Sequence, residues 1–122
     1  MSLIRVDNFG PSAGGTTYSA RGIAKAWVNF NGTGTVAVRD SENVSSLTDN
    51  GTGSYNVNYT NNFAAADYTT VFGGRIAASA LFAFLAGGND GQYVNLCSII
   101  TRNLTADTDA EIVTLNVHVD LA

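Results

Sequence analysis

Residues 23–41, IAKAWVNFNGTGTVAVRDS, decide the fold of this chain. Up to Phe30 successive residues alternate between two faces, and this period of two is typical of a β-strand. The motif NGTG follows directly at residues 31–34, and Asn-Gly is the favoured pair where both central residues of a hairpin turn need positive φ. The chain then returns as TVAVRDS. The stretch predicts a β-hairpin, and we expect Trp27 to lie in the core beside its turn.

A second NGTG motif, at residues 50–53, predicts a second hairpin. VSSLTD enters the turn and SYNVNYT leaves it, with Tyr55, Val57 and Tyr59 on one face and asparagines on the other. A phosphate-binding loop would instead open a helix, usually with a Lys and a Ser or Thr after its last Gly. Neither copy has that context, so the motifs indicate hairpins.

The rest of the chain continues the strand pattern. Further strands are predicted at residues 68–72, 93–101 and 112–122, the last with alternating apolar and polar faces. The alanines of residues 76–86 would support a helix, yet their alternation suits a strand covered on both faces, and the surrounding strands and turns favour the strand. The sum is about seven or eight short strands, which predicts an all-β, antiparallel β-sandwich of the jelly-roll or Ig-like type.

Composition excludes several classes of function. The chain has 122 residues, which suits one domain, and its net charge of -4 provides no field to attract the phosphates of nucleic acid. The opening MSLIRVDNFG contains an acid and lacks the continuous apolar core of a secretory signal. The longest apolar run, residues 76–86, is shorter than the roughly 18 residues of a membrane helix. We expect neither nucleic-acid binding nor membrane insertion.

Residues 1–20 are expected to form an anchoring arm ahead of a β-sandwich knob domain at residues 21–122. Gly14 and Gly15, beside Ser and Thr, are typical of a flexible joint. The apolar residues ahead of this joint are too few to build a core but sufficient to dock onto another surface. The candidate anchoring residues are Leu3, Ile4, Val6 and Phe9.

Residues 24–60 contain the words KAWVNF, GTGT, RDS, NVSS and DNGTG in this order. The block resembles a module that recurs at the C-terminal ends of tailed-bacteriophage tail fibres and in small phage virion proteins. ADYTTVFGG and ADTDAEIVTLNVHVD are similar to later parts of that family, whereas residues 76–101 have no distinctive match. The resemblance implies a β-sandwich knob exposed on a phage particle, commonly trimeric. Because no shaft repeats precede the module, we expect a capsid decoration, cement or short-fibre protein that binds the capsid or another virion protein.

The strand predicted at residues 93–101 needs cover on both faces. Apolar residues alternate onto both of its faces. A domain of this size has no second layer to supply that cover. A neighbouring subunit is the natural source, and the resemblance adds that three copies share one axis, which implies a homotrimer. The candidate trimer contacts are Val94, Leu96 and Ile100.

No residue pattern points to catalysis, a metal or a cofactor. His118, the only histidine, lies on a polar strand face, and no nucleophile or paired carboxylates accompany it. Asp107, Asp109 and Glu111 form an acidic series without the Gly and Glu that a calcium loop requires, so a solvated turn is expected. Cys97 lies in an apolar run and is predicted to be buried. We expect no enzyme.

A second function stays open, a receptor-binding tail-fibre tip that recognises host-surface glycans. Aromatic side chains would then have to emerge together on one face and stack on sugar rings. Tyr55 and Tyr59 share the face of Val57, so we expect both in the core. The aromatic candidates are Trp27, Tyr55, Tyr59, Tyr68 and Tyr93.

Overall fold

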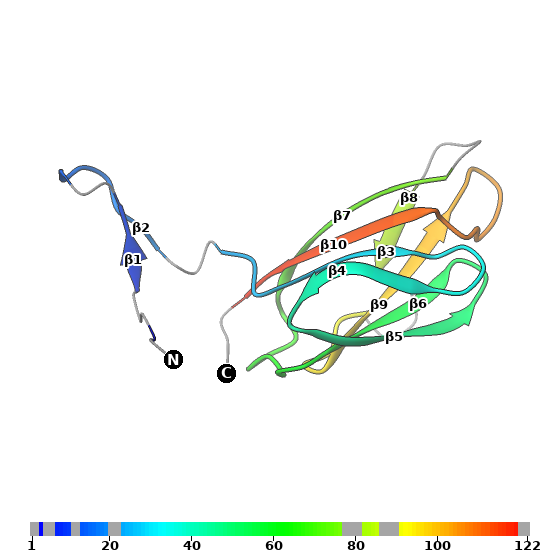
Figure 1. Cartoon of the computed structure of the whole chain (residues 1–122), viewed down its shortest axis with the longest axis horizontal. Coiled ribbons are helices and arrows are strands. Elements are labelled where there is room, and N and C mark those ends of the chain that lie inside the picture. Colours follow the sequence, from blue (N-terminus) through cyan, green and yellow to red (C-terminus); the bar gives the residue numbers. More distant parts are fainter. Residues whose placement is uncertain are drawn as a thin grey trace.

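The regular elements of the structure are β-strands. The structure is a computed structural model that describes residues 3, 7–10, 13–19, 23–76, 82–85 and 91–119. Within these residues, eight strands form two antiparallel four-stranded sheets, and two more strands form a small sheet of their own (Figure 1). The described residues include no helix of the length and hydrophobicity that crossing a membrane requires. The predicted all-β sandwich is confirmed.

The two sheets have the strand orders β4-β3-β10-β7 and β5-β6-β9-β8. The first sheet consists of β3 (Ala26–Asn31), β4 (Ala37–Glu42), β7 (Thr69–Arg75) and β10 (Ile112–His118). The second sheet consists of β5 (Val44–Gly51), β6 (Ser54–Tyr59), β8 (Phe82–Leu85) and β9 (Leu96–Arg102). β3 and β10, the first and last strands of the sandwich, are hydrogen-bonded neighbours. The finer alternatives, a jelly-roll or an Ig-like type, both stay predictions.

Alternation along the strands builds the core between the two sheets. In β3, β6, β9 and β10 every second residue is buried, as a period of two requires. The inward-facing side chains of these strands are Ala26, Val28, Phe30, Tyr55, Val57, Tyr59, Cys97, Ile99, Thr101, Val113, Leu115 and Val117. The inward faces predicted for residues 54–60 and, along β10, for residues 112–118 are therefore confirmed, as is the burial of Cys97. Residues 120–122 of the last predicted strand lie outside the described residues.

Trp27 lies on the outward face of the first sheet, so the prediction that places it in the core is wrong. Ala26, Val28 and Phe30 take the buried positions of β3, and Trp27 falls on the half-buried positions between them. Its backbone partners are Glu42 of β4 and Asn116 of β10. The size of the side chain suggested burial, but the alternation of the strand decides its face.

The two NGTG motifs form the two predicted hairpins with a different turn geometry. Neither Asn31 nor Asn50 has a positive φ, whereas the last glycines, Gly34 and Gly53, have φ values of 61° and 67°. The Asn31 side chain closes the first turn by donating to the carbonyl oxygen of Thr33 at 2.8 Å and accepting its hydroxyl hydrogen at 2.8 Å. Asparagine thus acts here through its amide and leaves the left-handed conformation to glycine.

β9 begins at Leu96, three residues later than the sequence predicts. Val94 lies in the segment before the strand, where its carbonyl oxygen accepts the N–H of Phe63 at 2.8 Å. Within residues 76–86, the predicted strand is found at Phe82–Leu85, which pairs with β9 as β8. Residues 77–81 and 86 lie outside the described residues.

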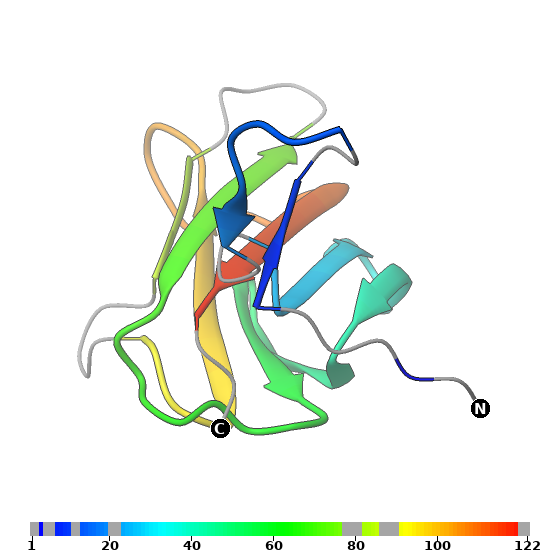
Figure 2. The same cartoon turned by 90° about the vertical axis from the view of Figure 1, so that its left-hand side faces the viewer.

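The N-terminal residues form a small sheet outside the two layers (Figure 2). β1 (Asn8–Phe9) pairs antiparallel with β2 (Tyr18–Ser19). Gly14 and Gly15 lie between these strands, so the predicted joint falls inside the arm instead of at its border with the sandwich. The arm lies beyond the end of the sandwich where β3 begins and β10 ends, and the NGTG turns lie at the opposite end (Figure 1).

Gly53→Ala is expected to destabilise the fold more than Gly34→Ala. Both positions have a positive φ, which costs a non-glycine residue about 1–2 kcal/mol. A Cβ at Gly34 would meet nothing within 4 Å, whereas a Cβ at Gly53 would lie 2.5 Å from the carbonyl oxygen of Thr101. Urea unfolding should show a further loss of about 1–3 kcal/mol for Gly53→Ala. Equal losses in the two variants would contradict this packing.

Candidate functional site

One carboxylate joins the two NGTG hairpins at the end of the sandwich opposite the arm. An Asp109 carboxylate oxygen accepts the N–H of Gly53 at 2.7 Å and lies 3.0 Å from the Tyr55 hydroxyl. That hydroxyl also lies 3.0 Å from the carbonyl oxygen of Gly32, so its single hydrogen is shared by two acceptors. The N–H of Gly32 donates to Ala110 at 2.9 Å. Asp109 is a structural residue, which corrects the expectation of a merely solvated turn.

The other acids of the series pair with arginines. Asp107 Oδ1 lies 3.1 Å from Arg102 Nε, and Glu111 Oε2 lies 3.7 Å from Arg75 Nε. Among the residues that the structure describes, no group of three or more His, Cys, Asp or Glu side chains could hold a metal ion. The acidic series therefore holds the loop before β10 against the sandwich.

Tyr59 and Tyr68 form the centre of a buried aromatic cluster at the arm end of the sandwich. Their rings pack around Phe63, with centroid distances of 4.5 Å and 5.2 Å from its ring. The Tyr59 hydroxyl donates to the Tyr68 hydroxyl at 3.2 Å, which donates to the carbonyl oxygen of Leu96 at 3.0 Å. Burial raises the pKa of both hydroxyls above the ordinary tyrosine value. The rings support the fold and are not available to stack on a ligand.

Two further titratable groups are enclosed in the core. Burial raises the pKa of the Cys97 thiol to about 11. Burial, and then the Asp109 carboxylate, raise the pKa of the Tyr55 hydroxyl to about 12. A protonated and inaccessible thiol is a poor nucleophile, so Cys97 is a structural residue.

The outward face of the second sheet carries a network of uncharged polar side chains beside the apolar Leu96 and Ile100. The Asn56 carboxamide oxygen accepts a hydrogen bond from the Ser98 hydroxyl at 2.8 Å. The Asn58 carboxamide nitrogen donates to the side-chain oxygens of Ser46 and Thr48, both at 3.1 Å. These amides are occupied by their neighbours and stiffen the sheet.

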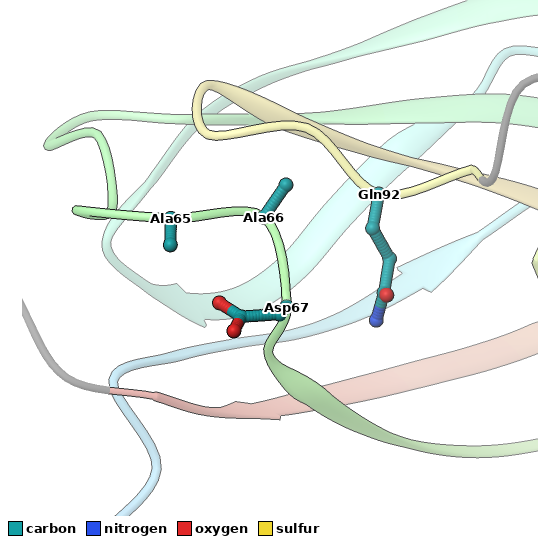
Figure 3. Close-up of a pocket in the computed structure, with 4 residues that line it drawn as sticks. All are labelled: Ala65, Ala66, Asp67 and Gln92. Carbon is teal, nitrogen blue, oxygen red and sulfur yellow. The ribbon is translucent and has the colours of Figure 1, made fainter.

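A hollow of about 470 Å³ lies beside the aromatic cluster, between the connection from β6 to β7 and the segment before β9 (Figure 3). Ala65, Ala66, Asp67 and Gln92 line it, and Gln92 Nε2 donates to the carbonyl oxygen of Tyr68 at 2.7 Å. The lining offers one carboxylate and one amide among small apolar side chains. It provides hydrogen-bonding groups and no pairing of a nucleophile with a base.

The predicted trimer contacts lie on two different segments. Leu96 and Ile100 lie half-buried on the outward face of β9, four residues apart. Val94 precedes the strand and is 39% exposed, next to Tyr93 at 38%. The structure therefore brings two of the three predicted residues onto one face.

The predicted anchoring residues belong to the arm. Leu3 is 68% exposed, and Phe9 lies in β1 with its backbone paired to Tyr18. Ile4 and Val6 lie outside the described residues. Leu3 is thus the anchoring candidate whose accessibility the structure supports.

The five aromatic candidates for sugar stacking do not emerge together. Tyr55, Tyr59 and Tyr68 are buried in the core. Tyr93 lies before β9, and Trp27 lies on the outward face of the first sheet. The histidine considered above, His118, lies on the half-buried face of β10 in the same sheet. A platform of several rings is therefore not formed by these residues.

Comparisons with known proteins found no relative, so the residues and their placement alone bear on the function. The chain matches no protein-family model, no curated protein and no solved structure.

Stability is expected to fall in alkali because the folded protein holds protons that the unfolded chain releases. The folded pKa values of Cys97 and Tyr55 are raised from 9.0 and 10.0 to about 11 and about 12. The contribution of these two groups to the free energy of unfolding is fully present below about pH 9. It is lost as the pH rises to about 12. Urea unfolding at a series of pH values should show this fall. Tyr55→Phe removes one such group and should make the fall shallower, and an unchanged slope would contradict the assignment.

Proposed function

We propose that this chain is a structural protein of a bacteriophage particle, a capsid decoration, cement or short-fibre protein on the particle surface. The sequence support is the ordered block at residues 24–60, which resembles phage virion proteins. The structural support is a sandwich that encloses Tyr55, Tyr59, Tyr68 and the Cys97 thiol in its core. A protein with this interior acts through its surfaces and its arm.

The placement of the arm carries this proposal. The β1–β2 sheet lies outside the two layers and beyond one end of the sandwich, and Leu3 in the same arm is 68% exposed. Burial of an exposed leucine at an interface is worth about 1.5–3 kcal/mol. An arm docked on the capsid or another virion protein would leave the NGTG end of the sandwich pointing away from the particle.

We further propose that the chain assembles as a homotrimer. Leu96 and Ile100 keep partial exposure on the outward face of β9 in the single chain, and Val94 lies close by in sequence. A contact between subunits would remove these apolar surfaces from water. Three copies, as opposed to two, follow from the resemblance to phage virion proteins.

The attachment is tested by sedimentation with phage particles produced without this chain. The full-length protein should sediment with the particles, and Leu3→Asp should weaken binding at least about tenfold because it sets a charge where an apolar side chain docks. Leu104→Asp is the matched control, since Leu104 is 79% exposed in the loop at the opposite end. Equal sedimentation of both variants would refute anchoring through the arm.

The trimer is tested by light scattering at micromolar concentration. The mass should be three times the chain mass of 12.7 kDa. Ile100→Asp should give a folded monomer, whereas Val71→Asp, on the outward face of the other sheet, should stay trimeric. A stable wild-type monomer would overturn the proposal, and dissociation of Val71→Asp alone would place the contact on the first sheet.

A further inference from the structure

The outward face of the first sheet carries a row of four side chains around the only tryptophan. Trp27 pairs with Glu42 on one side and with Asn116 on the other, and Asn116 pairs with Val71. With adjacent strands about 4.8 Å apart, the row spans roughly 14 Å. Trp27 and Asn116 are half-buried, and Val71 is 54% exposed. Across the sheet the row therefore presents an acid, an aromatic ring, an amide and a valine, in this order.

A second row runs beside the first and contains a bare position. Asn29 pairs with Asp40 and with Thr114, and Thr114 pairs with Gly73. A Cβ at Gly73 would lie 2.6 Å from Thr114 Oγ1, so glycine keeps this position free of a side chain. The two rows together provide amide, hydroxyl and carboxylate groups next to Trp27.

The polar groups nearest to Trp27 are unused within the described part of the chain. There, neither the Trp27 indole N–H nor the Asn116 carboxamide forms a side-chain hydrogen bond, while the Asn29 oxygen accepts only a long one, 3.4 Å from Arg39. On the opposite sheet the Asn56 carboxamide oxygen already accepts hydrogen bonds from Asn50 and Ser98. The side chains beside Trp27 on the first sheet thus keep hydrogen-bonding capacity for a ligand.

We propose that this face binds a neutral sugar ring, stacked on Trp27 and hydrogen-bonded by Asn116 and Asn29. One side of a sugar ring presents C–H groups, which pack on the negative face of an aromatic ring. Its hydroxyls donate and accept, and a carboxamide does both. The two negative charges of Asp40 and Glu42 exceed the single positive charge of Arg39 along these rows. This charge balance disfavours an acidic sugar.

A second copy of the chain is a less suitable occupant of this face. Two copies placed face to face would bring the carboxylates of Asp40 and Glu42 toward one another and desolvate them without a matching set of cations. A neutral sugar leaves both acids at the edge strand in water. The proposed site is independent of attachment through the arm, which lies outside the sheets.

Trp27 itself reports on binding, because its emission is the only tryptophan signal of the chain. The full-length protein is titrated with lactose, maltose, mannobiose and chitobiose, and with sialyllactose as an acidic comparison. At least one neutral disaccharide should change the emission in a saturable manner, and sialyllactose should bind more weakly. Asn116→Ala should reduce the affinity about tenfold, while Asn56→Ala on the opposite sheet should leave it unchanged.

A variant of Trp27 and a dilution control test the same site. Trp27→Phe keeps an aromatic ring without the indole N–H, and calorimetry should show weakened but measurable binding of the same disaccharide. The emission of the wild type should not change on dilution of the protein without sugar. No response to any of the four neutral disaccharides would overturn the proposal, and an emission shift that follows protein concentration alone would identify a contact between copies instead.

Discussion

The hydrogen bonds of Asp109 fix the end of the sandwich opposite the arm. Through Gly53 and Tyr55 the carboxylate holds the turn of the second sheet, and through the Tyr55 hydroxyl it reaches Gly32 in the turn of the first. A Cβ at Gly32 would lie 2.5 Å from that hydroxyl oxygen, so the contact requires glycine. The two similar motifs thus belong to one unit, in which Gly32 of the first motif contacts the Tyr55 hydroxyl and Gly53 of the second binds the Asp109 oxygen that the same hydroxyl contacts.

Strand alternation made most of the fold predictable from the sequence, and ambiguity in that alternation explains the error at Trp27. Periodicity shows which residues share a face but not which face turns inward. In residues 54–59 the two faces differ clearly, with tyrosines and valine on one and asparagines on the other. In residues 23–30 both sets contain large apolar side chains, and only pairing with β10, where Ala26 lies opposite Val117, selects the inward set.

The roles that the sequence did not reveal depend on contacts between distant segments. Asp109 has partners 56 and 54 positions earlier, and no local pattern distinguishes such an acid from a solvated one. The late start of β9 has a similar cause, because Phe63 binds Val94 and the Tyr68 hydroxyl binds Tyr93, which holds residues 93–95 as a connection. Trp27 was a candidate for stacking from the sequence, but only the strand pairing places the amide of Asn116 at its side on β10.

The position of β3 determines how the sandwich responds to mechanical force. β3 is the first strand after the arm, and it pairs with β4 on one side and with β10 on the other. A pull through the arm therefore acts along the strand, parallel to its length, and loads both hydrogen-bond ladders in shear. Ladders loaded in this way share the force among their bonds, whereas a strand pulled sideways loses its bonds one after another. A chain tethered by its arm is therefore held at a strand that is secured on both edges.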